Sequence, residues 1–457
     1  MSRLSVYRAC LRWPLVLLLV GTGAALASEL PSPVVATDYY DDGRPSVAKQ
    51  RLGNFLFFDK VLSGNKNISC ATCHHPQHFG GDGLSLPIGE GGEGLGTLRT
   101  TGSGDNAILE RVGRNAPPLF NLGAKEFVHL NWQGRHQNKG TRLSLPCATK
   151  DFNACPDGLD NVLAGQNLFP MVNTPEMLGH PFENDVSTST LRGVARFPVM
   201  WETYVTRLGE VDEYVELFRS AYPDIQSAAD MKIHHVVNAL AAFQTVAFRS
   251  DQSAFDRYLR GNPGALTAVQ KRGMELFYGK ANCASCHSGK FQTDHAFYAI
   301  AMPQAGPGAF VNGRSEKAED IGRYEVTGKI EDRYKFRTPS LRNVALTAPY
   351  GHDGAFATLE GIVRHHLNPV ESFANWDATQ MVLPSRSDLD ELDVFIMNDP
   401  ASAERIVAAN QLAAVELADT EVQDLLAFLD TLTDPTVATR LNRVIPIRVP
   451  SGLPVED

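Results

Sequence analysis

The sequence predicts a mainly helical protein made of two similar domains with long loops. Three observations favour this fold class. The pattern Cys-x-x-Cys-His occurs twice, at 70–74 and 283–287, and each copy is followed further along the chain by apolar residues at helical spacing. With 43% hydrophobic and 21% charged residues, the composition is that of a folded chain with a core. The 38 glycines and 27 prolines favour long connections.

The first 27 residues predict a secretory signal peptide. Arginines precede a short apolar run at 15–20, and the small residues Ala25 and Ala27 form a cleavage site. Because the apolar run is too short to span a bilayer, we expect cleavage near Ser28 and export to the periplasm. Disulfide bonds persist in such a compartment.

The charge and hydropathy of the chain indicate whether nucleic acid or a membrane is an expected partner. The net charge is −10 and no basic run occurs, which argues against nucleic acid as a partner. No later segment is long and apolar enough to predict a membrane span.

The two Cys-x-x-Cys-His motifs are attachment signatures for c-type haem. Two thiols at this spacing form thioether bonds with the haem vinyl groups, and the next residue places its imidazole on the iron. A single copy is also compatible with a redox dithiol or half of a zinc site, but two copies, each followed by His, favour two covalent haems. The predicted attachment residues are Cys70, Cys73, His74, Cys283, Cys286 and His287.

A third pair of cysteines, Cys147 and Cys155, has no adjacent histidine. Because the chain is expected to be exported, we predict a local disulfide that closes the loop at 144–156, with free thiols as the alternative.

The two haem motifs lie in a weak internal repeat. A segment of the pattern Gly-x-x-Leu-Phe precedes each motif, at 53–57 and at 273–277. An amphipathic helix is predicted later in each repeat, over 233–243 and 422–432. One helix before the motif and a later helix packed on it form the minimal layout of a c-type cytochrome.

The boundary between the repeats is predicted at the segment 261–264, Gly-Asn-Pro-Gly, which is the best candidate for a linker. This divides the mature chain into an N-terminal haem domain, 28–260, and a C-terminal haem domain, 261–457.

Each proximal histidine leaves one axial position of its iron, and the residue there decides between an electron carrier and a catalyst. For the second haem the candidates are Met302, His352, His365 and His366. In a predicted helix over 358–366, the spacing places His366 on the buried apolar stripe and His365 away from it. We therefore predict His366 as the ligand.

For the first haem the residues themselves indicate less. His75 and His78 lie too close to His74 to reach the opposite face of the haem easily, and we expect them at the surface. The stretch 166–176 offers an amide, a proline and a carboxylate, which alone is typical of a polar loop.

Several further motifs resemble those of the bacterial di-haem cytochrome c peroxidases and their MauG-type relatives, over most of residues 45–435. They are RNAPPLFN at 114–121, NWQGR at 131–135, PSLRNV at 339–344 and LTAPYGHDG at 346–354. The resemblance implies two helical haem domains, of which the first reacts with hydrogen peroxide and the second transfers electrons.

The resemblance also implies catalytic roles for four residues. Trp132 corresponds to a tryptophan that lies between the two haems and relays electrons. Gln166, Pro170 and Glu176 correspond to the pocket over the first haem, where they orient the peroxide, keep the pocket tight and move the peroxide proton. General acid–base transfer of this kind accelerates a reaction about 10²–10⁴-fold.

A calcium ion between the domains is implied in the same way. Its ligands would be the side chain of Asn115 and the main-chain oxygens of Thr347 and Pro349, and oxygen ligands of this kind suit a hard cation.

Two positions depart from the family pattern. His366 stands where related proteins have Met or Tyr, which bears on the potential of the second haem. Glu90, in a glycine-rich loop, occupies the position of a histidine that blocks the first iron in reductively activated peroxidases. We therefore expect an open first haem in the fully oxidised protein, with Glu90 itself as an alternative ligand.

Three functions follow as hypotheses. The first is a peroxidase that reduces hydrogen peroxide with electrons from a small redox protein. The second is a MauG-like enzyme that uses peroxide to oxidise Trp or Tyr side chains of a partner protein, which Glu90 favours over a reductively activated peroxidase. The third is a non-enzymatic di-haem electron carrier in which both irons are six-coordinate.

Overall fold

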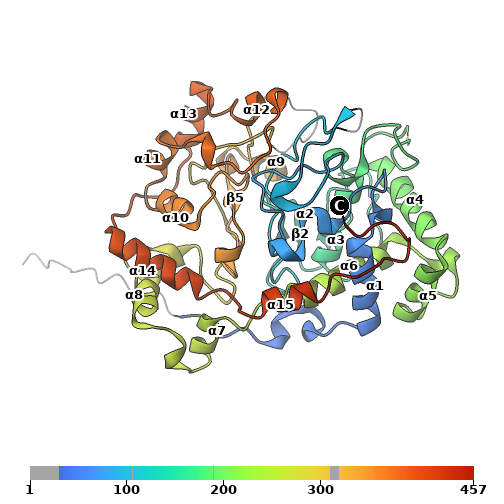
Figure 1. The fold of residues 1–457 in the computed structure, drawn as a ribbon, viewed down its shortest axis with the longest axis horizontal. Helices are drawn as coiled ribbons and strands as arrows, with labels where there is room; N and C mark the ends of the chain where they lie inside the picture. The colour runs from blue at the N-terminus through green and yellow to red at the C-terminus, as the bar shows by residue number, and fades with distance from the viewer. Residues whose placement is uncertain (1–29, 105–106, 189, 309–318, 457) are drawn as a thin grey trace, which may run out of the picture.

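The computed structural model describes residues 30–104, 107–188, 190–308 and 319–456 and confirms the mainly helical fold (Figure 1). The predicted signal peptide, 1–27, lies outside the described residues. No helix in the described ranges is long and apolar enough to cross a membrane.

The helices and strands are short, and long irregular segments connect them, as the glycine and proline content predicts. The α-helices of the first half are α1 (Val47–Phe58), α2 (Cys70–Cys73), α3 (Val162–Gln166), α4 (Phe197–Gly209), α5 (Asp212–Ala221) and α6 (Ile233–Ala247). The α-helices that follow are α7 (Ala254–Leu259), α8 (Ala268–Tyr278), α9 (Tyr324–Thr327), α10 (Leu359–Leu367), α11 (Pro369–Ala374), α12 (Ser387–Asp393), α13 (Pro400–Ala408), α14 (Asp419–Asp430) and α15 (Val437–Asn442).

The strands form two small antiparallel sheets. β1 (His129–Leu130), β2 (His136–Asn138) and β3 (Leu143–Ser144) lie in that order, and β4 (Phe297–Tyr298) pairs with β5 (Phe336–Arg337). The first sheet places the segment around Trp132 in the connection between two strands.

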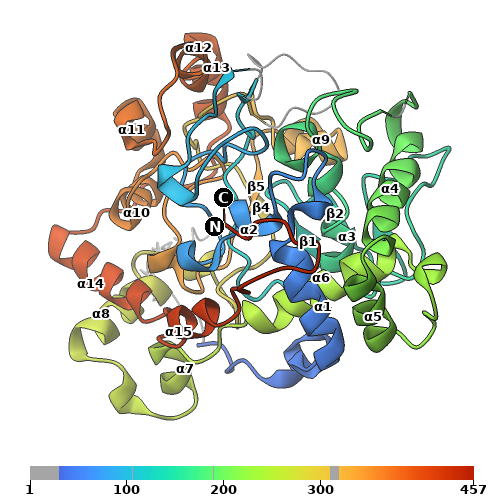
Figure 2. The same ribbon diagram turned by 45° about the vertical axis from the view of Figure 1, so that its right-hand side comes forward.

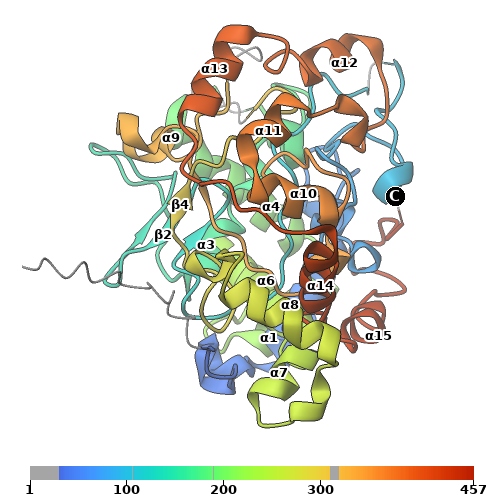
Figure 3. The ribbon, with the colours of Figure 1, turned by 90° about the vertical axis from the view of Figure 1, so that its left-hand side faces the viewer.

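The internal repeat is visible as two pairs of packed helices. Helix α1 packs against α6 in the first half, and α8 packs against α14 in the second half (Figures 2 and 3). Both predicted later helices are thus present, each packed on the helix that precedes a Cys-x-x-Cys-His motif.

A glycine makes each of these helix crossings close. A Cβ atom on Gly53 of α1 would collide with the carbonyl oxygen of Ala239 in α6. In the same way, a Cβ atom on Gly273 of α8 would collide with the carbonyl oxygen of Asp424 in α14. In both halves, therefore, a glycine allows the close approach of the two helix backbones.

Two hydrophobic cores surround these helix pairs, and the C-terminal segment belongs to the first of them. After α14 in the second half, Leu441 of α15 and Val449 are buried in the first core. The side chain of Asn54 in α1 also donates a hydrogen bond to the carbonyl oxygen of Val444, at 2.6 Å. Figure 1 shows α15, in red, beside the blue and green helices α1 and α6. The division at residue 261 stays a prediction, and the C-terminal segment crosses it.

The predicted disulfide between Cys147 and Cys155 is confirmed. It joins two residues of one loop, and the main-chain N–H of Ala154 donates to the carbonyl oxygen of Cys147 at 2.9 Å. The disulfide restrains the loop that follows β3.

Replacement of Gly273 by alanine tests the helix crossing. Alanine stabilises an ordinary helix by about 1 kcal/mol relative to glycine, but overpacking a close contact costs about 1–3 kcal/mol. Because the obstacle is backbone of α14, we expect Gly273→Ala to lower the urea midpoint of unfolding. Glu275→Ala, on the exposed side of α8, is the control and should change the free energy of unfolding by less than about 0.5 kcal/mol. An unchanged or raised midpoint for Gly273→Ala would contradict the packing argument.

Candidate active site and haem-binding residues

The first Cys-x-x-Cys-His motif forms α2, with His74 at its C-terminal end. The ring Nδ1 of His74 lies 2.9 Å from the carbonyl oxygen of Gly80, which fixes Nδ1 as the protonated nitrogen and leaves Nε2 for a metal. Burial lowers the pKa of His74, so the ring is neutral, as an iron ligand must be.

The second motif repeats this arrangement. The Nδ1 atom of His287 lies 3.2 Å from the carbonyl oxygen of Gln292. Burial, reinforced by the neighbouring His366, lowers the pKa of His287 to about 4. The second proximal candidate is therefore also a neutral imidazole with its Nε2 free.

The thiols of the motifs do not resemble reactive redox cysteines. Burial raises the pKa of Cys70 and of Cys283 to about 12, whereas a catalytic Cys-x-x-Cys pair has a lowered pKa. Half-buried thiols beside an imidazole with a free Nε2 fit covalent attachment of haem at both motifs.

His366 lies opposite His287. The two ring centres are 6.1 Å apart, and the Nδ1 of His366 lies 2.8 Å from the carbonyl oxygen of Ile362, one turn earlier in α10. This contact leaves Nε2 of His366 free, and the separation of the two rings leaves room for a metal that both histidines would hold.

Met302 is buried in the second hydrophobic core, the same core against which Cys283 and Ile362 pack. The ring of His352 is stacked on Phe336, with 3.7 Å between centroids.

The expectation that His365 points away from the interior was wrong. Its side chain is fully buried (0% exposed), and its Nε2 lies 2.8 Å from the carbonyl oxygen of Ile300, whereas His366 is only partly buried. The helix buries two faces, because His365 points into the protein on a second side. The apolar stripe that contains His366 remains the side that faces His287.

The residues of the predicted peroxide pocket follow one another on three short helical elements. Gln166 ends α3, Pro170 begins a 3-10 helix (Pro170–Val172), and Glu176 lies in a π-helical turn (Thr174–Leu178). The main-chain N–H of Gly64 donates to the carbonyl oxygen of Met177 at 2.8 Å, which joins this turn to the loop just before Cys70.

Glu176 has the electrostatic character of a proton-transfer group. Burial raises the pKa of its carboxyl above the ordinary value, while a hydrogen bond from Asn173 and the charge of Arg135 act in the opposite direction. The side-chain amide of Asn173 donates to Oε1 of Glu176 at 2.5 Å and so orients the carboxyl. Burial and these two interactions thus act in opposite directions on the pKa of Glu176, which suits a carboxyl that takes up and releases a proton.

His136 is a residue of this region that sequence reasoning missed. It is 2% exposed, and neither ring nitrogen makes a hydrogen bond within the described residues. Burial lowers the pKa of His136 to about 3, helped by the charge of Arg135 and opposed by Gln166. A neutral imidazole thus lies beside the pocket amide. Its position directly after the NWQGR motif was the one signal available in the sequence.

Trp132 lies where the two halves of the chain meet. Its indole Nε1–H donates to the carbonyl oxygen of Asn115 at 2.9 Å, and its own carbonyl oxygen accepts from the N–H of Arg337 in β5 at 2.8 Å. The indole is 8% exposed. Trp132 is therefore held by groups from both halves.

Asn115 has a free oxygen of the kind that a calcium ion needs. Its side-chain amide donates to the carbonyl oxygen of Leu84 at 2.9 Å, and no hydrogen bond from the described residues reaches its Oδ1. The main-chain oxygens of Thr347 and Pro349 likewise accept no hydrogen bond in the described part of the chain. This donor set fits a hard cation.

Glu90 is buried rather than exposed in its glycine-rich loop. Its Oε1 accepts hydrogen bonds from the side-chain amides of Asn65, at 2.9 Å, and Asn67, at 2.6 Å. Its main-chain N–H donates to the carbonyl oxygen of Pro175 at 3.1 Å, directly beside Glu176.

Comparison with known proteins agrees with this arrangement. A family model described as di-haem cytochrome c peroxidase matches residues 47–264. The chain is 27% identical over 394 residues to the methylamine utilization protein MauG of Methylorubrum extorquens, over 86% of this chain and 80% of that protein. It is 29% identical over 324 residues to the cytochrome c551 peroxidase of Pseudomonas aeruginosa, over 70% of this chain and 72% of that protein.

Solved structures support the fold. The crystal structure of a MauG-like protein associated with microbial copper homeostasis matches with a TM-score of 0.55 and 24% identity, over 91% of this chain and 96% of that chain. The fold and the two motifs define a di-haem c-type oxidoreductase. The chain is similar to di-haem cytochrome c peroxidases and to MauG over most of the length of these proteins.

Replacement of His366 tests the assignment of the second axial ligand. His366→Ala should convert a low-spin haem to a high-spin haem in the absorption spectrum, and added free imidazole should restore the low-spin spectrum. His365→Ala is the matched control: it removes a buried side chain and should lower stability without changing the spin state. A spin change in His365→Ala but not in His366→Ala would refute the assignment.

Proposed function

We propose that the protein is an exported di-haem peroxidase that reacts with hydrogen peroxide at its first haem and receives electrons through its second. The observation that carries this proposal is the Glu176 turn. A carboxyl with a raised pKa lies on a segment bonded to the loop before Cys70, because the N–H of Gly64 donates to the carbonyl oxygen of Met177.

Two covalent haem groups are the cofactors. When bound, they supply the site of peroxide binding and the redox change. The residues that would hold them are Cys70, Cys73, His74, Cys283, Cys286, His287 and His366. The histidines fit this role because each has its Nδ1 against a carbonyl oxygen, which leaves Nε2 for the metal.

Glu176 acts as the proton carrier in this proposal. Its carboxylate accepts a proton from one peroxide oxygen and delivers it to the other, which leaves as water when the O–O bond breaks. Two electrons and two further protons complete the reduction of one peroxide to two waters. Asn173 holds the carboxyl by its Oε1, and Gln166 offers an amide to orient the peroxide. Pro170 limits the space and offers no ligand atom.

Trp132 and a calcium ion would serve electron transfer between the halves. The indole is buried and bonded to both halves, which suits a relay. The proposed calcium ligands are Asn115 Oδ1 and the main-chain oxygens of Thr347 and Pro349, and Asn115 joins the two halves because its N–H donates to the carbonyl oxygen of His352. The same residue, Asn115, would thus hold the ion and the indole.

The electron source separates two versions of this function. A small redox protein would be the donor of a peroxidase, whereas Trp or Tyr side chains of a partner protein would be oxidised by a MauG-like enzyme. Glu90 favours the MauG-like version, because a carboxylate stands where a blocking histidine is expected and is bound by Asn65 and Asn67. Both versions place the protein in the periplasm.

Stopped-flow mixing of the fully oxidised protein with stoichiometric peroxide tests this proposal. We expect an immediate spectral change without prior reduction, because no histidine stands at the blocking position. Glu176→Gln should slow the reaction by about 10²–10⁴-fold, since it keeps the shape but removes the proton acceptor. Absence of any change until one electron is added would identify a reductively activated peroxidase instead.

The pH dependence of the same rate follows from the raised pKa of Glu176. A raised pKa keeps the carboxyl protonated to higher pH, and the protonated form cannot accept the peroxide proton. The rate should therefore fall as the pH is lowered through a value above the ordinary 4.5 of a glutamate. Glu176→Gln should abolish this part of the profile, and an identical profile in that variant would assign it to another group.

A further inference from the structure

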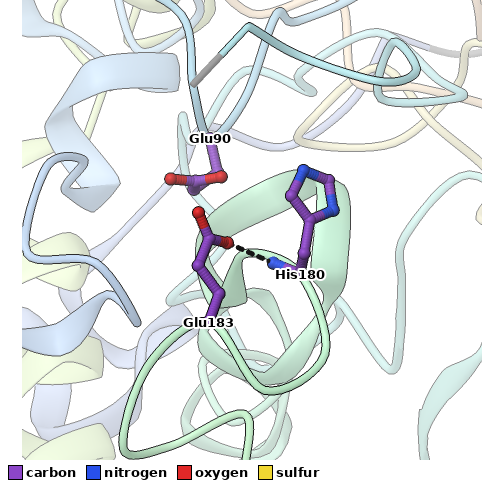
Figure 4. A group of neighbouring side chains, drawn as sticks. All are labelled: Glu90, His180 and Glu183. Atoms are coloured by element: carbon purple, nitrogen blue, oxygen red, sulfur yellow. Dashed lines mark hydrogen bonds between the residues drawn. The ribbon is translucent and has the colours of Figure 1, made fainter. Parts of the chain in front are cut away.

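We propose that Glu90, His180 and Glu183 form a binding site for a divalent transition-metal cation, separate from the haem and calcium sites. Each residue offers one ligand atom, and these atoms all lie within 4.8 Å of one another. Figure 4 shows the two carboxylates facing each other, with the imidazole of His180 beside them.

Glu90 is a fixed and buried ligand. It is 7% exposed, and the amides of Asn65 and Asn67 both donate to its Oε1. No hydrogen bond from the described residues reaches its Oε2. Amides that hold one carboxylate oxygen orient the other, as residues behind a metal ligand commonly do.

The two sides of the site are joined by a chain of hydrogen bonds. Asn184 follows Glu183 directly, and its amide donates to Oδ1 of Asn65 at 3.0 Å and to the carbonyl oxygen of Leu178 at 2.8 Å. The main-chain N–H of His180 donates to Oε2 of Glu183 at 2.7 Å, and Figure 4 marks this bond. The ligands therefore come from two segments that are already held together.

The negative charges of Glu90 and Glu183 favour binding of a cation. Two carboxylates face each other, one of them buried, and neither makes an ion pair with a Lys, Arg or His within the described residues. Arg99, which lines the neighbouring cavity, donates instead to the carbonyl oxygens of Gly89 and Gly94. Burial of an unpaired carboxylate is costly unless it is paired or binds a metal.

The donor set indicates the class of metal. One imidazole nitrogen with two carboxylate oxygens is typical of Zn²⁺ and related first-row cations, whereas Ca²⁺ takes six to eight oxygens. Ligand atoms around tetrahedral Zn²⁺ lie about 3.3–3.6 Å apart, which rotations of the more exposed Glu183 and His180 can reach. A cavity of about 500 Å³ beside Glu183 provides an entry path and room for water as a fourth ligand.

The position of the site gives it a role in the proposed peroxidase, and this step rests on the proposed function. The N–H of Glu90 bonds to Pro175, and a Cβ atom on Gly89 would collide with the same carbonyl oxygen of Pro175, so the loop lies directly on the Glu176 turn. A cation bound by Glu90, His180 and Glu183 would pin the loop to the segment 174–183 and hold the turn that carries Glu176.

Titration of the chelator-treated, haem-loaded protein with Zn²⁺ tests the site, with calcium kept in excess to saturate the other proposed site. We expect one Zn²⁺ per chain by calorimetry. Glu183→Gln and His180→Ala should each weaken binding at least about 10-fold. Glu202→Gln, an exposed glutamate of α4 that does not line this cavity, is the control and should bind as the parent does. Unchanged haem spectra and melting temperatures would show that the variants are folded.

Amide hydrogen exchange supplies a second readout that does not depend on peroxide. Zn²⁺ should slow exchange in segments 88–94 and 174–183 of the parent and of Glu202→Gln, but not in Glu183→Gln. No bound Zn²⁺ in the parent, or equal affinity in Glu183→Gln and His180→Ala, would overturn the site. Bound Zn²⁺ without slower exchange would overturn the pinning of the turn. Neither result depends on whether the protein is a peroxidase.

Discussion

The close crossing of two helices in each half is the constraint on which the rest of the structure depends. Gly53 and Gly273 bring the backbones of α1 and α6, and of α8 and α14, closer than any other residue allows. The haem motifs follow the first helix of each pair, so the crossing sets where each proximal histidine stands. Phe243 and Phe428, four residues after the contacted carbonyls, lie against the same glycines and complete a matching pair of cores.

Main-chain carbonyl oxygens orient the histidine rings that this scaffold positions. His74, His287 and His366 each direct Nδ1 at a carbonyl oxygen, which fixes the tautomer and the direction in which Nε2 points. Burial keeps the same rings neutral by lowering their pKa values. The backbone therefore orients the three histidines that we propose as iron ligands, which lie far apart in the sequence.

The sequence predicted the features that are local or repeated. The two Cys-x-x-Cys-His motifs, the amphipathic helices and the disulfide between Cys147 and Cys155 were predicted from residues that lie close together in the sequence. The burial of His365 was not predictable, since periodicity finds one apolar face and α10 buries two. The association of Glu90 with His180 and Glu183 and the return of α15 to the first core depend on long-range packing, which no local pattern encodes.

Asn115 is one of the residues that join the two halves. Its N–H donates to the carbonyl oxygen of His352 in the second half, while its own carbonyl oxygen accepts from the indole of Trp132. Its side-chain amide is held by the carbonyl oxygen of Leu84, so that Oδ1 has a fixed direction. Because Asn115 holds the indole through its carbonyl oxygen and offers Oδ1 to the proposed ion, a cation at Oδ1 would act on the proposed relay Trp132 through this residue. A loss of that cation would then change electron transfer between the halves before it changed the peroxide pocket, which is built on other segments.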